Sequence, residues 1–252
     1  MSAFLFITDL DHTLVGDDAA LEKLNEQLGQ HRQVYGTKIV YATGRSLTLY
    51  RQLTQEKPLL TPDALITAVG TEIYLNPNQD IFDSAWADKL ALGWNREKIV
   101  AIAGEFSDLI PQPETEQNPF KVSYFISDQI ASDLIPELES ALKNQNLSIQ
   151  LIYSGGKDLD ILPQNSDKGL AIEYLRRKWN MESHNTVVCG DSGNDIALFS
   201  IPNKSGILVG NAQPELLQWY EENANDSLYL AKAACAGGIL EGLYSFNLLP
   251  NP

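Results

Sequence analysis

Short apolar segments alternate with longer amphipathic ones at the start of this chain of 252 residues. Buried strands are predicted over residues 4–8, 38–43 and 64–70, and helices over 46–56 and over 19–29, which ends on a glycine. Such alternation is typical of a parallel sheet built with right-handed crossovers. The opening segments therefore predict an α/β fold.

The same alternation returns near the other end of the chain. Helices are predicted over 168–179, 194–200, 214–222 and 237–246, and strands over 185–190 and 205–210. We expect both ends to share one doubly wound parallel sheet with a Rossmann-like arrangement.

Between these two parts the order of the segments changes. Helices are predicted over 96–110 and 131–145, and strands over 121–127, 148–154 and 157–163. Pro136 should lie in the first turn of the second helix or kink that helix. We expect residues 1–82 and 162–252 to form a discontinuous core domain, and residues 83–161 to form an inserted α/β cap domain across a cleft.

The amino-acid composition disfavours some classes of binding partner. Acidic side chains outnumber basic ones by 33 to 18, a net charge of −15, which disfavours nucleic acid and anionic lipid as partners. No apolar run approaches a membrane span, and the N-terminus has no secretion signal, so a cytoplasmic protein is expected. Cys189 and Cys235 lack metal-type spacing and are expected to be two buried thiols.

Two aspartates follow the first predicted strand directly, in "FLFITDLD". Ligands of an open parallel sheet bind beyond the carboxyl ends of its strands, so Asp9 and Asp11 should lie at that edge. Neighbouring carboxylates repel each other unless a cation or a shared proton lies between them, and Mg²⁺ suits such oxygen ligands. The alternative is a pair of turn-forming aspartates.

Two further segments place phosphate-binding groups at the same edge. Thr43 and the backbone N–H groups of Gly44 and Arg45 follow the second strand in "YATGR" and can hold phosphate oxygens, although Thr43 can also be a helix cap. Lys168 opens a predicted helix, where a cation is unfavourable unless an anion lies nearby. An ordinary surface lysine is the alternative.

A third oxygen-rich segment follows a later strand, in "VVCGDSGNDIALF". Asp191, Asn194 and Asp195 gather around a predicted helix start. They can be plain helix caps, but metal ligation is favoured because the same edge already carries Asp9 and Asp11.

These segments together resemble the haloacid dehalogenase superfamily of phosphatases. Its four motifs occur here in order, as "DLDHT", the threonine of "YATGR", the lysine of "DKG", and "GDSGND". The resemblance implies that Asp9 is the nucleophile and that Asp11 is the general acid and base. It implies that Thr43 and Lys168 bind the transferring phosphoryl group.

The resemblance also implies a bound Mg²⁺. Its ligands would be Asp9, the backbone carbonyl of Asp11, and Asp191, with Asn194 and Asp195 close by. His12 adjoins the first motif, but strand alternation directs it away from the two aspartates, so no role is expected for it.

Longer stretches, including "LITAVGTEIY", "SGGKDLDILPQNSDKG" and "GNAQPELLQWY", resemble the sucrose-phosphate phosphatase family, in its shorter cyanobacterial form. The resemblance implies hydrolysis of sucrose 6-phosphate, the last step of sucrose synthesis. We also expect a monomer and a possible transient contact with sucrose-phosphate synthase.

A disaccharide needs many polar contacts, and the insert and its flanks carry suitable side chains. Besides Gly44, Arg45 and Asn194, the candidate substrate-binding residues are Thr71, Glu72, Gln117, Asn118, Lys121, Lys157, Asp158 and Asp160. A solvated polar surface is the alternative for each of them. Trp86, Trp94 and Tyr124 are expected in the core rather than under a sugar.

Two other functions stay open on the sequence. One is a phosphatase for another ester, such as mannosyl-3-phosphoglycerate, trehalose phosphate or a hexose phosphate, which the same motifs predict equally well. The other is a catalytically silent binding partner of a synthase, although a silent module has no chemical need for the full set of motif residues.

Overall fold

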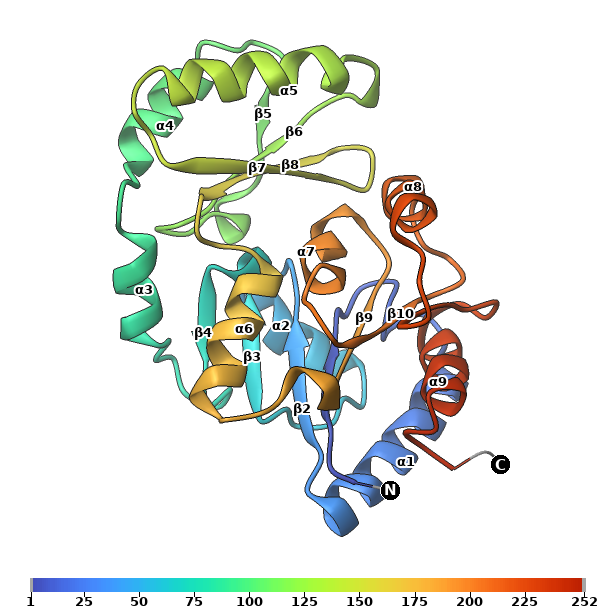
Figure 1. Cartoon of the computed structure of the whole chain (residues 1–252). Coiled ribbons are helices and arrows are strands. Elements are labelled where there is room, and N and C mark those ends of the chain that lie inside the picture. The colour runs from blue at the N-terminus through green and yellow to red at the C-terminus, as the bar shows by residue number, and fades with distance from the viewer. Residues whose placement is uncertain (1, 251–252) are drawn as a thin grey trace.

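A computed structural model describes residues 2–250 as two sheets with helices on their faces (Figure 1). The larger sheet has seven strands in the order β11-β10-β9-β1-β2-β3-β4. All neighbours in it are parallel except β4, which runs antiparallel to β3. The strands are β1 (Leu5–Thr8), β2 (Lys38–Ala42), β3 (Ala64–Thr67), β4 (Glu72–Tyr74), β9 (Thr186–Gly190), β10 (Ser205–Leu208) and β11 (Leu228–Leu230). The predicted α/β fold is confirmed.

Helices cover both faces of the larger sheet because its strands are apolar on both sides. Phe6 packs toward one face with α1, α2 and α9, whereas Leu5 and Ile7 pack toward the other with α3, α6, α7 and α8. The first set is α1 (Asp18–Tyr35), α2 (Leu47–Glu56) and α9 (Cys235–Ser245). The second is α3 (Ser84–Leu90), α6 (Lys168–Lys178), α7 (Ile196–Phe199) and α8 (Pro214–Asn223).

The smaller sheet is antiparallel, has the order β5-β6-β8-β7, and lies beyond the carboxyl ends of the larger one (Figure 1). Its strands are β5 (Ile110–Pro111), β6 (Val122–Phe125), β7 (Ile149–Ser154) and β8 (Asp158–Pro163). Helices α4 (Arg96–Ala103) and α5 (Asp128–Lys143) pack on one face of it. The opposite face is directed toward the larger sheet. Short 3₁₀ segments are η1 (Ala68–Gly70), η2 (Glu114–Glu116), η3 (Ser183–Asn185) and η4 (Gly193–Asp195).

The predicted cap domain, 83–161, contains α3, but this helix packs on the larger sheet. Trp86 and Leu90 lie in the cluster formed with β1 and α6, and the Trp86 indole N–H donates to the Gly70 carbonyl at 3.0 Å. The predicted positions of Trp86 and Tyr124 in the apolar core are confirmed. The domain boundaries themselves stay predictions.

Two helix predictions were wrong at particular residues. Helix α1 continues through Gly29 to Tyr35, since Leu28 and His31 extend its buried stripe, and it ends at Gly36, whose φ of 81° is left-handed. One interior glycine costs about 1 kcal/mol, which such burial can offset. Pro136 is the ninth residue of α5, so the predicted place in the first turn is wrong, while the predicted kink stays a prediction. It lies on the exposed side, where water can satisfy the freed carbonyl.

Other segments differ from the sequence interpretation in extent. The helix predicted over 96–110 ends at Ala103, and Ile110 belongs to an edge strand. Strands β4 and β11 were not predicted because each has only three residues.

Cys189 and Cys235 are free and buried, as predicted. Within residues 2–250, no helix has the length and apolarity needed to cross a membrane.

Candidate active site

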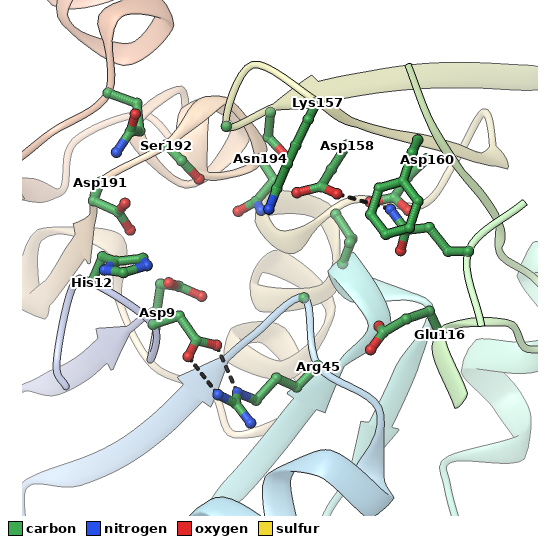
Figure 2. Close-up of a pocket in the computed structure, with 18 of the residues that line it drawn as sticks. Asp9, His12, Arg45, Glu116, Lys157, Asp158, Asp160, Asp191, Ser192 and Asn194 are labelled. Carbon is green, nitrogen blue, oxygen red and sulfur yellow. Dashed lines mark hydrogen bonds and ion pairs between the residues drawn. The ribbon is translucent and has the colours of Figure 1, made fainter. Parts of the chain in front are cut away.

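A cavity of about 550 Å³ lies between the carboxyl ends of β1, β2 and β9 and the facing side of the smaller sheet. Figure 2 shows Asp9, His12 and Asp191 on one side of it and Lys157, Asp158 and Asp160 on the other. Its position at the edge where parallel strands end is the position predicted from the sequence.

Three buried carboxylates gather at the floor of this region. One oxygen from each of Asp9, Asp191 and Asp195, here called the carboxylate cluster, lies within 4.8 Å of the others. Lys168 Nζ donates to Asp9 Oδ1 at 2.8 Å and to Asp195 Oδ1 at 2.7 Å. The lysine is fully buried at the start of α6, so the anion expected near it is this cluster.

The electrostatics of the cluster favour a bound cation. Burial, together with Asp195 and Asp191, raises the pKa of Asp9 well above its usual value even though Lys168 opposes this shift. Burial and Asp195 also raise the pKa of Asp191 to about 6. Burial opposes the charge of Lys168, yet Asp195 and Asp9 together raise the pKa of this lysine. When all three carboxylates are ionised, one ammonium leaves two negative charges, which a divalent cation with oxygen ligands would neutralise.

Hydrogen bonds from the loops after β9 and β1 hold two of these carboxylates. Asp195 Oδ2 accepts from the backbone N–H groups of Asp191 at 3.0 Å and Ser192 at 3.2 Å. Thr13 Oγ1 donates to Asp191 Oδ1 at 2.6 Å. Gly190 has no room for a side chain, because a Cβ there would lie 2.5 Å from Asp195 Cβ. The glycine in this motif therefore permits the close turn.

Asp11 lies apart from the carboxylate cluster and pairs with Arg45. The guanidinium donates to both carboxylate oxygens at 2.7 Å, one from Nε and one from Nη2.

Thr43 is fully buried, and its Oγ1 accepts from the Arg45 N–H at 3.1 Å. The N-cap of α2 is Ser46, so the helix-cap alternative for Thr43 is wrong. Gly44 and Arg45 line the cavity as predicted.

Three buried polar side chains lie together on the side of the smaller sheet that faces the cavity: Lys121, directly before β6, Ser123 in β6 and Asp160 in β8. Lys121 Nζ lies 3.4 Å from Asp160 Oδ1, and Ser123 Oγ donates to the same oxygen. Asp158 lies two residues earlier on the same face of β8, as the predicted alternation requires. Lys157 and Asn194 complete the predicted substrate-binding residues that the structure brings to the cavity.

Four predicted substrate-binding residues do not line the cavity, because their polar atoms bond within the protein. Asn118 Nδ2 donates to Thr71 Oγ1 at 2.8 Å, which ties the insert to the segment after β3. Glu72 accepts from Thr67 and Tyr74. Gln117 accepts from the Ser123 N–H and donates to the Ser123 carbonyl.

The sequence interpretation missed several lining residues: His12, Gln112, Glu116, Phe125, Ser154, Ser192 and Gln213. His12 lines the cavity because the chain leaves β1 at Thr8 and turns, with φ of 57° at His12, so strand alternation does not apply to it. Phe125 was detectable, since alternation along β6 places it opposite the buried Tyr124.

Comparisons with known proteins match nearly the whole chain. The family model "Sucrose-6F-phosphate phosphohydrolase" matches residues 2–247. Probable sucrose-phosphatase 2 of Arabidopsis thaliana is 43% identical over 98% of this chain, which spans only 60% of that protein. Mannosylfructose-phosphate phosphatase of Agrobacterium fabrum is 32% identical, with 98% of both chains covered.

A solved structure is similar along the whole chain. The sucrose-phosphatase of Synechocystis sp. PCC6803, in complex with sucrose and phosphate, is 45% identical, covers 100% of both chains and superposes with a TM-score of 0.91. The cavity described above therefore lies in a fold that is shared with a protein whose structure holds a sugar and a phosphate.

Proposed function

Since this chain belongs to the sucrose-6F-phosphate phosphohydrolase family, we propose that it hydrolyses sucrose 6-phosphate to sucrose and phosphate. One observation carries the proposal: Asp9 and Asp191 of the carboxylate cluster line a cavity whose opposite wall is polar and belongs to the smaller sheet, and the buried Lys168 donates to Asp9. The first wall suits phosphoryl transfer, and the second suits a sugar. The Synechocystis relative that holds sucrose and phosphate supports the same assignment.

Asp9 is proposed as the nucleophile of the first step. Lys168 holds its Oδ1, which leaves Oδ2 as the oxygen that attacks phosphorus. The new O–P bond forms as the bond from phosphorus to the sugar oxygen breaks. Asp11 is proposed to give that oxygen its proton, which requires one carboxyl oxygen to leave Arg45 and carry the proton, because both oxygens accept from the guanidinium in this structure. Sucrose leaves, and Asp9 carries the phosphoryl group.

Water completes the second step. Asp11, now a carboxylate, accepts a proton from a water molecule whose oxygen attacks phosphorus. The bond between phosphorus and Asp9 breaks, so inorganic phosphate forms and the Asp9 carboxylate is restored. Lys168 and Thr43 are proposed to bind the oxygens of the transferring group.

A divalent cation, proposed to be Mg²⁺, fits the carboxylate cluster. Asp9, Asp191 and Asp195, with the backbone carbonyl of Asp11, would hold it, and Asn194, whose Oδ1 is buried without a hydrogen-bond partner among residues 2–250, lies beside them in the cavity wall. When bound, such an ion neutralises charge on the phosphoryl oxygens and lets Asp9 approach them.

The facing wall is proposed to select the sugar. Lys157, Asp158 and Asp160 offer charged hydrogen-bonding groups to sucrose hydroxyls, and Lys121 holds Asp160 in place. Phe125 adds an aromatic ring, 37% exposed, on the same face of the sheet as Asp158, with which it is paired in register. A ring beside a carboxylate can contact the C–H face of a sugar while the carboxylate accepts from its hydroxyls.

Phosphate release from a set of esters tests the substrate. The set should contain sucrose 6-phosphate, mannosylfructose phosphate, trehalose 6-phosphate and fructose 6-phosphate, each with and without Mg²⁺. We expect the highest kcat/KM with sucrose 6-phosphate and loss of activity with a chelator. A preference for mannosylfructose phosphate, on which a full-length relative acts by its name, would overturn the substrate but keep the chemistry.

Inactivity on every ester would favour the silent binding module instead. A monomeric state and transient contact with sucrose-phosphate synthase are also proposed, and light scattering of the protein alone and mixed with the synthase tests both.

A further inference from the structure

One core carboxylate contacts the smaller sheet at the edge of the cavity. Glu215 is the second residue of α8, and its Oε1 accepts from the backbone N–H of Gly155 at 2.8 Å. Gly155 belongs to the β7–β8 turn, residues 155–157, which extends toward α8 (Figure 1). The next residue of α8, Leu216, is fully buried against the larger sheet, so Glu215 stands on a fixed support.

The same oxygen also reaches the loop of the carboxylate cluster. Glu215 Oε1 accepts from the Gly193 N–H at 3.3 Å, and Gly193 lies between Asp191 and Asp195 in the chain. Glu215 takes part in no ion pair among residues 2–250. Its hydrogen bonds within that range therefore go to two backbone N–H groups, one in the β7–β8 turn and one in the loop of the carboxylate cluster.

The two walls also touch directly at this point. A Cβ on Gly193 would lie 2.5 Å from the carbonyl oxygen of Tyr153, in β7, and 3.0 Å from Glu215 Cγ. The loop and the strand thus pack backbone to backbone, with Glu215 beside the contact. Any outward movement of the β7–β8 turn must break the hydrogen bond between Glu215 and Gly155.

The turn itself carries groups proposed to contact the sugar. Lys157 ends it and Asp158 begins β8, and both line the cavity with Ser154 and Gly155. From this arrangement we infer that Glu215 is a positioning residue, which holds the β7–β8 turn against the loop of the carboxylate cluster and so fixes Lys157 and Asp158 over the substrate. The assignment of the substrate rests on the proposed function; the inferred contact does not.

Three variants test the inference in the full-length chain: Glu215→Ala, Glu215→Gln and the control Glu222→Ala. Glu222 lies on the same helix, is exposed, and makes no side-chain hydrogen bond or ion pair within residues 2–250. We expect Glu215→Ala to raise the KM for sucrose 6-phosphate about tenfold, about 1.4 kcal/mol, with a smaller change in kcat. Glu215→Gln keeps an acceptor oxygen and should stay within about threefold of the wild type.

Hydrolysis of p-nitrophenyl phosphate separates this role from simple support of the loop. This ester has no sugar hydroxyls for Lys157 and Asp158 to contact, so its kcat/KM should change less than twofold in Glu215→Ala. Equal losses on both esters would overturn the inference, because they would show that Glu215 supports only the loop. An unchanged KM for sucrose 6-phosphate would overturn it as well.

Amide hydrogen exchange provides a readout that does not depend on turnover. In the protein with sucrose and phosphate present, we expect the Gly155 amide to exchange about tenfold faster in Glu215→Ala than in the wild type or Glu222→Ala. Equal exchange rates would contradict the contact. If the wild type hydrolyses no sucrose 6-phosphate, the proposed function fails, and this measurement in the protein without ligands still decides on the contact.

Discussion

Arg45 and Asp11 form a two-point ion pair across the carboxyl ends of β1 and β2, with both N–O distances at 2.7 Å. The hydrogen bonds to Asp11 raise the pKa of Arg45, and Arg45 lines the cavity beside Asp11. Both residues are only half-buried, so the pair contributes little to stability. Its consequence is geometric, because a planar guanidinium fixes the plane and direction of the carboxylate.

Arg45→Lys should therefore lower kcat for sucrose 6-phosphate by about tenfold, since a lysine keeps the charge but cannot form the two-point contact. Steady-state kinetics measure this. Arg51→Lys is the matched control, because Arg51 also pairs with an aspartate, Asp80, but lies outside the cavity. Equal kcat values for wild type and Arg45→Lys would show that the orientation of Asp11 does not depend on Arg45.

Phe125→Ala should raise the KM for sucrose 6-phosphate by about tenfold, because the sugar loses an apolar contact surface in the cavity. Phe125→Tyr keeps the ring and should stay near the wild type. Ile81→Ala removes another exposed apolar side chain, 74% exposed and not part of the cavity lining, and should leave the KM unchanged. A similar KM for wild type and Phe125→Ala would exclude the ring from sugar recognition.

The sequence predicted the residues whose position follows from a strand end. Asp9, Lys168 and Asp191 all lie at the carboxyl edge of the larger sheet or at a helix start beside it, so periodicity was sufficient. Asn118 and Thr71, predicted to bind substrate, lie outside the lining of the cavity and bond to each other, a tertiary contact between residues 47 apart in sequence. No local pattern signals such a contact.

The predictions from sequence were also wrong for some residues outside regular strands. His12 was misplaced because the alternation rule was extended past the end of β1, and Glu215 was not singled out because a polar residue in the first turn of a helix is ordinary. Predicted helix ends were wrong where buried side chains extended the helix further along the sequence, as α1 extends beyond Gly29.

Substitution of two glycines by alanine should change the free energy of unfolding in opposite directions. Gly70 has φ of 96°, and a Cβ there would lie 2.3 Å from the backbone carbon of Asp167, so Gly70→Ala should destabilise the fold by about 3 kcal/mol. Gly29 lies inside α1 with open space around it, so Gly29→Ala should stabilise by about 0.5–1 kcal/mol. Urea unfolding measures both. Destabilisation by Gly29→Ala, or none by Gly70→Ala, would contradict the structure.

Lys204 should make stability depend on pH in the alkaline range. Burial lowers the pKa of this lysine from 10.5 to about 8, and it takes part in no ion pair among residues 2–250. Between these two pH values the unfolded chain binds more protons than the folded one, so the free energy of unfolding should rise with pH, by up to about 2 kcal/mol after allowance for solvent screening.

Lys204→Met should remove this dependence and stabilise the protein at pH 7. Chemical unfolding at pH 7, 8, 9 and 10 checks it by difference from the wild type, and Lys232→Met, an exposed lysine, controls for the loss of one charge. Identical pH profiles for wild type and Lys204→Met would mean that Lys204 is solvated.

The most direct test of the central claim is the rate of phosphate release from sucrose 6-phosphate, with Mg²⁺, by the wild type and by Asp9→Asn. The variant keeps the size of the side chain but lacks the nucleophilic carboxylate, so at least a 1,000-fold lower kcat is expected, about 4 kcal/mol, with folding confirmed by circular dichroism. Appreciable turnover by Asp9→Asn would contradict the account, because hydrolysis would then proceed without an aspartyl-phosphate at Asp9.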